Sequence, residues 1–249
     1  MKNDIKKRRI LLLLIPFVIL IAMICAFLMW GLFGSYKPSE EAYAVLNEID
    51  PDIQNIYGRD YIAFVPEHYD KGLILYPGAK VDYRAYLPLI YEMAKQDVLC
   101  AVVHFPFDIA FFNPDACEDV MSDFQDVDSW YIAGHSLGGV VASDYLSNCP
   151  EKFDGLIFLA SYSTKDLSAY DINVFSIIGT RDMVLNMEAY HESERYLPDD
   201  YFEYVIEGGN HGYFGSYGSQ KGDGTADITE KQQRDMIVRC ISDYMQSVY

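Results

Sequence analysis

The most informative segment of the chain reads Gly134-His135-Ser136-Leu137-Gly138-Gly139. An apolar run typical of a strand, residues 129–133, precedes it, and a segment with the apolar face of a helix, residues 140–146, follows it. A Gly-x-Ser-x-Gly turn between a strand and a helix is a nucleophile elbow, in which the serine lies on a tight bend with its hydroxyl exposed. Glycines suit this bend because a Cβ would crowd it or the strand packed against it. The segment therefore predicts a nucleophilic serine at position 136.

An acid and a histidine follow later strand-like runs, in the chain order that such an elbow requires. The apolar run 173–179 is followed by Asp182, and the run 201–207 is followed by His211. Because catalytic groups gather at the carboxyl ends of parallel strands, we expect these side chains to meet beside Ser136. His211 would take the proton of Ser136, and Asp182 would hold the imidazole in the useful tautomer.

Other aspartates and histidines fit these two roles less well. Asp182 follows a strand directly, although a helix N-cap is its structural alternative. The remaining histidines precede the serine, lie inside the elbow or fall within a predicted helix. The rejected candidates are Asp166, Asp171, Asp199, Asp200, His68, His104, His135 and His191.

Two backbone N–H groups are expected to stabilise the oxyanion of an acyl transfer. One belongs to the residue after the nucleophile, Leu137. The other should lie in the loop 77–81, which follows the strand-like run 72–76. We assign it to Ala79, with Lys80 as the alternative. Donors of this kind contribute about 3–4 kcal/mol each in the transition state.

These motifs resemble those of serine hydrolases with the α/β-hydrolase fold. The closest pattern joins a Tyr-Pro-Gly-x-x-Val loop at 76–81 with the elbow and a late Gly-Gly-Asn-His at 208–211. It is loosely similar to that of bacterial dienelactone hydrolases and covers roughly residues 58–246. The resemblance implies a serine hydrolase whose triad falls on Ser136, Asp182 and His211, and it leaves the substrate open.

Apolar runs and helix-like segments alternate along the rest of the chain, which predicts an α/β fold with a mostly parallel sheet flanked by helices. The central strands read as continuous apolar runs, as expected for strands buried on both faces. Strands are predicted at 59–66, 72–76, 98–105, 129–134, 154–160, 173–179 and 201–207. Helices are predicted at 84–96, 115–126, 137–148, 187–196 and 228–246.

Two predicted loops flank the serine and supply the candidate substrate-binding residues. Only about a dozen residues separate the strands 154–160 and 173–179, which is too short for a lid domain.

The glycine- and aromatic-rich loop 212–224 contains Tyr213 and Phe214, and Phe107 follows another strand. We expect these three aromatic residues to line an acyl or aromatic subsite. An ordinary surface loop is the alternative for residues 212–224.

The amino-terminal sequence predicts a membrane anchor. Residues 10–30 form an apolar run of 21 residues, long enough to cross about 30 Å of hydrocarbon as a helix. Residues 1–9 carry five basic residues and one acid, an excess that should stay cytoplasmic. We therefore expect a cytoplasmic tail at 1–9, a single spanning signal-anchor at 10–32, a linker and first amphipathic segment at 33–57, and an extracytoplasmic hydrolase domain at 58–249. A cleaved signal peptide is the competing interpretation.

The net charge and the cysteine positions restrict which partners, disulfides and cofactors we expect. The tail contributes +4 to a total of −18, which leaves −22 on residues 10–249 and disfavours binding to nucleic acid. Apart from Cys25 in the apolar run, Cys100, Cys117, Cys149 and Cys240 could form two disulfides, and a Cys117–Cys149 bridge is conceivable. The cysteines lack the spacing of metal ligands, so we do not expect a bound metal. We expect no organic cofactor either. The sequence leaves the oligomeric state open.

The sequence thus predicts a membrane-anchored, extracytoplasmic serine hydrolase that cleaves a small-molecule ester, thioester or similar acyl bond through an acyl-enzyme. An acyltransferase would use the same residues and differ only in the acceptor. A catalytically inert binding or scaffolding domain on the same fold is the alternative from another class.

Overall fold

The computed structural model describes residues 15–27, 29, 31 and 34–247 and divides the chain into two compact units, Met1–Ser35 and Tyr36–Tyr249. In the first unit, residues 15–27 are helical. No helix formed by the described residues is long and apolar enough to cross a membrane. The predicted tail 1–9 and part of the predicted spanning segment 10–32 lie outside the described residues.

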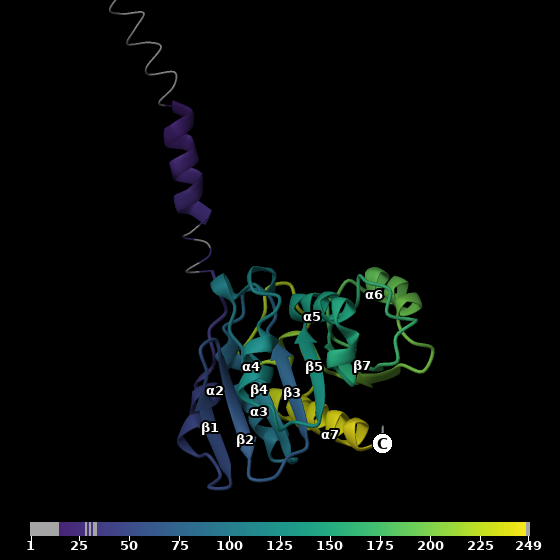
Figure 1. Ribbon diagram of the computed structural model, residues 1–249. Coiled ribbons are helices and arrows are strands. Elements are labelled where there is room, and N and C mark those ends of the chain that lie inside the picture. Colours follow the sequence, from purple (N-terminus) through teal and green to yellow (C-terminus); the bar gives the residue numbers. More distant parts are fainter. Residues whose placement is uncertain (1–14, 28, 30, 32–33, 248–249) are drawn as a thin grey trace, which may run out of the picture. The chain divides into compact units, whose positions relative to one another are not determined.

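The second unit is built on one eight-stranded sheet in the order β1-β2-β4-β3-β5-β6-β7-β8, drawn as arrows in Figure 1. From β4 to β8 every neighbouring pair is parallel, whereas β2 runs antiparallel to both β1 and β4. The mostly parallel sheet expected from the apolar runs is confirmed. The strands are β1 Ile53–Tyr57, β2 Tyr61–Pro66, β3 Lys71–Tyr76, β4 Val98–Val103, β5 Ser129–His135, β6 Gly155–Leu159, β7 Asn173–Gly179 and β8 Phe202–Ile206.

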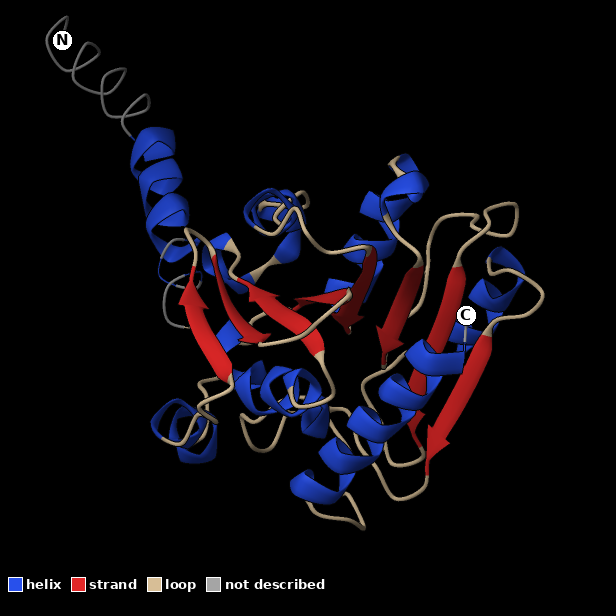
Figure 2. Cartoon of the chain, turned by 60° about the horizontal axis from the view of Figure 1, so that its bottom comes forward, coloured by secondary structure: helices blue, strands red, loops and turns tan. Residues whose placement is uncertain are grey.

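Helices cover both faces of this sheet (Figure 2). The α-helices of this unit are α2 Glu40–Ala44, α3 Leu87–Ala94, α4 Cys117–Asp123, α5 Leu137–Asn148, α6 Met187–Ser193 and α7 Glu230–Ser247. Short 3₁₀ turns are η1 Val45–Asn47, η2 Tyr83–Tyr86, η3 Pro106–Asp108, η4 Ala110–Phe112, η5 Pro150–Lys152, η6 Glu194–Tyr196 and η7 Gly212–Phe214. Each of the five predicted helices is present.

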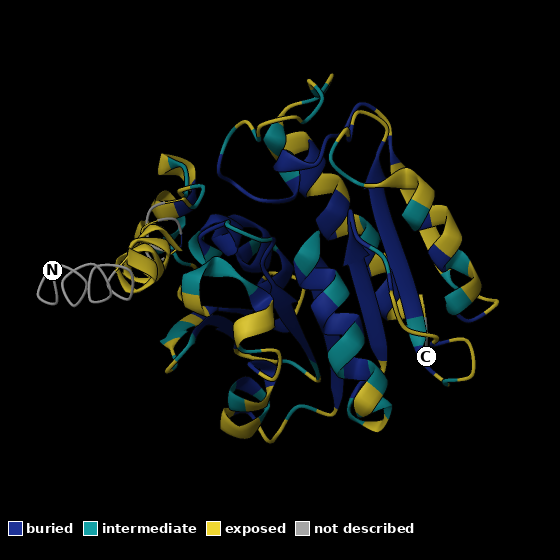
Figure 3. Ribbon diagram, turned by 90° about the horizontal axis from the view of Figure 1, so that it is seen from above, coloured by how far each residue is buried: buried dark blue, intermediate teal, exposed yellow. Residues whose placement is uncertain are grey.

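Two apolar cores lie on opposite faces of the sheet. One contains side chains of α3 and α7, such as Ile90 and Ile241, against the sheet. The other contains side chains of α4 and α5, such as Val120 and Leu146. The middle strands contribute to both cores and are therefore buried throughout (Figure 3). This double burial is the reason that their sequences are continuously apolar rather than alternating.

The compact domain begins at Tyr36, not at residue 58 as expected from the sequence. Tyr36 forms a parallel bridge with Val81, and β1 pairs with β2 along its whole length. Glu41 of α2 forms an ion pair of 2.6 Å with Arg234 of α7, whose side chain is 10% exposed. The sequence does not reveal β1 because it is an edge strand in which only Ile53 is buried, so its pattern is weak.

The cysteines of the described residues are free. Cys100 and Cys117 are buried, and burial raises the pKa of both thiols. Cys117 and Cys149, the pair considered for a disulfide, both carry free thiols.

Candidate active site

Ser136 occupies the bend between β5 and α5, with φ +52° and ψ −126°. A non-glycine residue in this region is strained, and such strain is common at functional positions. The neighbouring backbone approaches so closely that side chains are excluded. A Cβ on Gly138 would lie 2.2 Å from the Tyr76 carbonyl oxygen, and a Cβ on Gly134 would lie 2.3 Å from the Gly139 Cα. The glycine spacing is therefore a steric requirement of the bend.

A serine that follows the neighbouring strand β6 also holds the bend in place. Ser161 Oγ donates to the Ser136 carbonyl oxygen at 2.6 Å, and the Ser136 N–H donates to Leu159 O at 3.0 Å. Ser161 is 1% exposed. Sequence analysis did not identify it, although its position directly after an apolar strand at the carboxyl edge of the sheet is a signal that could have found it.

The structure brings Asp182 and His211 together after β7 and β8. Asp182 Oδ2 lies 2.7 Å from His211 Nδ1, and each side chain is 1% exposed. Asp182 Oδ1 accepts the N–H groups of Val184 and Leu185, both at 2.8 Å. Because the carboxylate only accepts, the proton of this bond lies on Nδ1, which leaves the lone pair of His211 on Nε2.

Close backbone packing and a buried amide place His211. A Cβ on Gly179 would lie 2.4 Å from Gly209 O, so the end of β7 touches the turn that leads to the histidine. Gln233 of α7 accepts from the Asn210 N–H at 3.0 Å and donates to the Asn210 carbonyl oxygen at 2.8 Å. Gln233 is fully buried and was not identified from the sequence, because nothing local ties α7 to residue 210.

His211 Nε2 is buried and has no hydrogen-bond partner among the described residues. Ser136, partly exposed at the start of α5, therefore does not bond to it in this state. Catalytic hydrogen bonds are often formed only when substrate is bound. The arrangement offers an acceptor nitrogen that is held rigidly through its other ring nitrogen.

The backbone donors beside the serine differ in whether they are already used. The Gly78 N–H donates to the Tyr86 hydroxyl at 3.0 Å, and the Lys80 N–H donates to Asp108 O at 2.7 Å. Within the described part of the chain, the N–H groups of Ala79 and Leu137 have no acceptor. This pattern favours Ala79 over Lys80 as the second oxyanion donor.

Tyr86 and His135 form a buried pair beneath the site. The Tyr86 hydroxyl accepts from the Gly78 N–H at 3.0 Å and shares a hydrogen bond with His135 Nδ1 at 2.7 Å. The His135 ring lies 4.5 Å from the His211 ring. Burial, reinforced by the neighbouring His211, holds the pKa of His135 well below its ordinary value. Tyr86 was not identified from the sequence, because the contact spans 49 residues.

The three predicted substrate-binding residues have different surroundings. Phe214 is fully buried and stacks on His135 at a centroid distance of 5.5 Å, so it belongs to the core under the site. Tyr213 is half-buried, and its N–H donates to Asn210 Oδ1 at 3.1 Å. Phe107 lies in η3 with φ +59° and packs on Phe112 at 5.6 Å. The structure therefore places Phe214 in the core, whereas Tyr213 and Phe107 are half-buried.

The loop 212–224 is fastened to the acid–histidine pair. Asp223 Oδ2 accepts the Gly212 N–H at 2.8 Å, and Asp223 Oδ1 accepts the Met183 N–H at 3.3 Å. Asn210 Nδ2 also donates to Gly224 O at 2.9 Å. These bonds fasten the end of the loop to the segments that carry Asp182 and His211.

Among the described residues no group of three or more His, Cys, Asp or Glu side chains is arranged to hold a metal ion. The chemistry that the geometry supports is acyl transfer to a serine: a strained nucleophile, a buried acid–histidine pair and two unused backbone donors.

Comparison with known proteins agrees with this geometry. The profile of the Alpha/beta hydrolase family matches residues 72–235. A predicted CIB-like hydrolase from Thermoplasma acidophilum superposes with a TM-score of 0.57 at 12% identity, over 79% of this chain and all of the other. No curated protein matches the sequence.

Two further solved structures give the same picture. A monoacylglycerol lipase from Paleococcus ferrophilus has a TM-score of 0.57 at 12% identity, with 77% of this chain and 99% of the other covered. A putative hydrolase from Bacillus subtilis has a TM-score of 0.55 at 12% identity, with 81% and 98% covered. At this identity the likeness concerns the fold.

Proposed function

Because the chain belongs to the alpha/beta hydrolase family, we propose that it is a serine hydrolase that cleaves an ester, thioester or similar acyl bond. The observation that carries this proposal is the buried Asp182–His211 pair, joined at 2.7 Å at the carboxyl edge of the sheet that also presents Ser136. The finer likeness to dienelactone hydrolases rests on the sequence motifs and stays a prediction.

The proposed reaction uses each group in one role. Ser136 Oγ attacks the acyl carbonyl carbon while His211 Nε2 takes its proton. The oxygen that becomes negative is bound by the N–H groups of Ala79 and Leu137. His211 then protonates the leaving alcohol or thiol, and in the second half it activates the water that releases the acyl group from the serine. Asp182 stabilises the imidazolium in both halves.

We further propose that residues 10–32 anchor the chain in the membrane, with residues 1–9 cytoplasmic and the hydrolase domain outside. The support is the apolar run of 21 residues and the basic excess before it. Proteolysis of intact cells tests this topology: external protease should remove the domain and leave the tail protected. Release of the domain into the medium without protease would instead indicate a cleaved signal peptide.

The catalytic proposal is tested by labelling the purified full chain with a fluorophosphonate serine probe and measuring its intact mass. One adduct is expected on the wild type and on Ser168→Ala, which alters an exposed serine, whereas Ser136→Ala should form none. A folded wild type that forms no adduct would contradict the proposal and favour an inert binding domain. Product analysis with an added alcohol then separates a hydrolase from an acyltransferase.

A further inference from the structure

Two adjacent phenylalanines are exposed on the connection between β4 and α4. Phe111 is 60% exposed and Phe112 is 50% exposed. We call residues 106–112, which also contain Phe107, the aromatic loop. Large apolar side chains that are exposed side by side mark a contact surface more often than an isolated one does.

The aromatic loop is held in a defined shape. Phe107 and Asp108 both have left-handed backbone, with φ of +59° and +56°. Lys80 secures them, because its N–H donates to Asp108 O at 2.7 Å and its Nζ donates to Phe107 O at 3.3 Å. The Phe107 and Phe112 rings pack edge to face at 5.6 Å. The exposed rings therefore stand on a braced turn.

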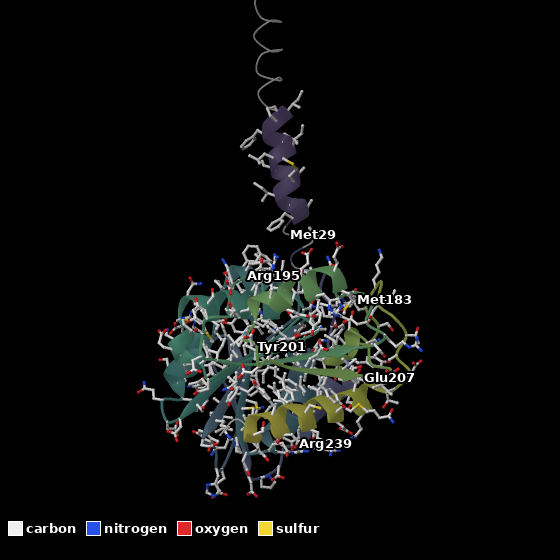
Figure 4. All side chains as sticks on the ribbon, turned by 90° about the vertical axis from the view of Figure 1, so that its right-hand side faces the viewer. Met29, Met183, Arg195, Tyr201, Glu207 and Arg239 are labelled. Atoms are coloured by element: carbon white, nitrogen blue, oxygen red, sulfur yellow. The ribbon has the colours of Figure 1, made fainter. Side chains whose placement is uncertain are left out.

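The same loop adjoins the proposed active site. Lys80 is the neighbour of Ala79, and η4 of the aromatic loop contacts α5, the helix that begins after Ser136. Other exposed apolar residues lie at this carboxyl edge of the sheet. Tyr57, at the end of β1, is 64% exposed, and Met183, beyond the end of β7, is 73% exposed and visible at the surface in Figure 4.

The polypeptide enters the domain at this edge. The Tyr36 N–H donates to Lys80 O at 2.7 Å, and the Asp82 N–H donates to Tyr36 O at 3.1 Å. Tyr36 is thus fixed to the loop that carries Ala79. Six residue steps separate Tyr36 from Trp30, the last residue of the apolar run, and an extended chain spans at most about 20 Å over that length.

We propose that the aromatic loop contacts the bilayer in which residues 10–30 are anchored and holds the proposed site at the lipid surface. The substrate is then an acyl ester that resides in the membrane. This proposal rests on the proposed function and anchor. Aromatic rings are favoured at the interface between headgroups and hydrocarbon. Because the domain and the remaining segment carry −22 together, the contact is apolar and requires no anionic lipid.

Fluorescence quenching in vesicles tests the contact. The full chain, in a Trp30→Phe background, is reconstituted into phosphatidylcholine vesicles with or without bromine on the acyl chains. Phe111→Trp is compared with Phe202→Trp, which is 64% exposed at the opposite, amino-terminal edge of the sheet. Brominated lipid should lower the added emission of Phe111→Trp about twofold and leave that of Phe202→Trp unchanged. Equal responses would overturn the proposal.

Hydrolysis provides an independent readout. Phe111→Ser/Phe112→Ser should hydrolyse a water-soluble short-chain ester at the wild-type rate but a long-chain ester in vesicles about tenfold more slowly. Phe202→Ser should behave like the wild type on both. Equal rates of the double variant and the wild type on the vesicle ester would contradict the proposal. If the wild type hydrolyses neither ester, the proposed function fails, while the quenching result still decides the membrane contact.

Discussion

At the scale of single residues, the site depends on polar atoms that are buried and paired. Ser161 donates to the carbonyl oxygen of Ser136 itself, whereas Tyr86 and Gln233 bind His135 and Asn210, the chain neighbours of Ser136 and His211. Leaving such a partner unsatisfied costs about 1–3 kcal/mol. These residues should therefore position the reacting groups without touching the substrate.

The buried His135 predicts a loss of stability in acid. Burial lowers its pKa in the folded state, so below about pH 6.5 the unfolded chain binds a proton there that the folded chain does not. The stability that His135 contributes in its neutral form is fully present above that pH. As the pH falls, the free energy of unfolding should decrease by up to about 1.4 kcal/mol per unit from this group.

Urea unfolding at pH 7.5 and pH 5 measures this effect. His135→Gln should show a smaller decrease than the wild type, whereas His68→Gln, which alters an exposed histidine, should match the wild type. An undiminished decrease in His135→Gln would show that other groups cause the acid sensitivity.

At the scale of elements, the carboxyl edge is assembled by direct packing of backbone on backbone. The start of α5 presses on the end of β3, and the end of β7 presses on the turn before His211. Glycines at these two contacts let four segments meet within a few ångströms. These two contacts therefore fix where the bend at Ser136 and the turn before His211 lie.

Gly138→Ala tests this contact. Its Cβ would lie 2.2 Å from Tyr76 O and 2.4 Å from Pro77 O, and neither backbone oxygen can move cheaply. We expect a loss of about 3 kcal/mol in the free energy of unfolding, at the upper end of overpacking effects, together with loss of probe labelling at Ser136.

Gly222→Ala is the matched control, because its φ is +89° but no atom lies within 4 Å of the added Cβ. It should cost about 1 kcal/mol and leave labelling intact. If both substitutions lowered the free energy of unfolding and the labelling equally, the close contact between Gly138 and β3 would not be what limits the elbow.

At the scale of the whole molecule, the amino-terminal segment of the domain completes its sheet and its ion pairs. Residues 36–57 supply the bridge at Val81, the edge strand β1 and the Glu41–Arg234 ion pair. A chain that begins at residue 58 would expose β2 as an edge and leave Arg234 without Glu41.

Truncation distinguishes the two domain boundaries. Residues 36–249 should melt close to the full chain in thermal unfolding, whereas residues 58–249 should melt at least about 10 °C lower, which corresponds to several kcal/mol at this size. Equal melting temperatures of the two truncated chains would place residues 36–57 outside the cooperative unit.

Most of the sheet could be predicted from sequence because buried parallel strands are continuously apolar. Seven strands and five helices were expected close to where they lie, and α5 matches residue for residue. The eighth strand, β1, was missed because an edge strand leaves most of its residues exposed. The proposed acid and histidine were found by their order along the chain and by the strands they follow, and the structure brings them into contact.

What the sequence by itself determined is therefore local: the strand–turn–helix around Ser136, the runs that form the core, and the order of serine, acid and histidine. The tertiary structure alone decided that Phe214 lies in the core, that Ala79 rather than Lys80 has an unused N–H, and that Tyr86, Ser161 and Gln233 support the site. The physical reason is range. Periodicity and turn chemistry act between near neighbours, whereas these contacts join residues 23 to 49 positions apart or depend on which face of the packed sheet a side chain meets.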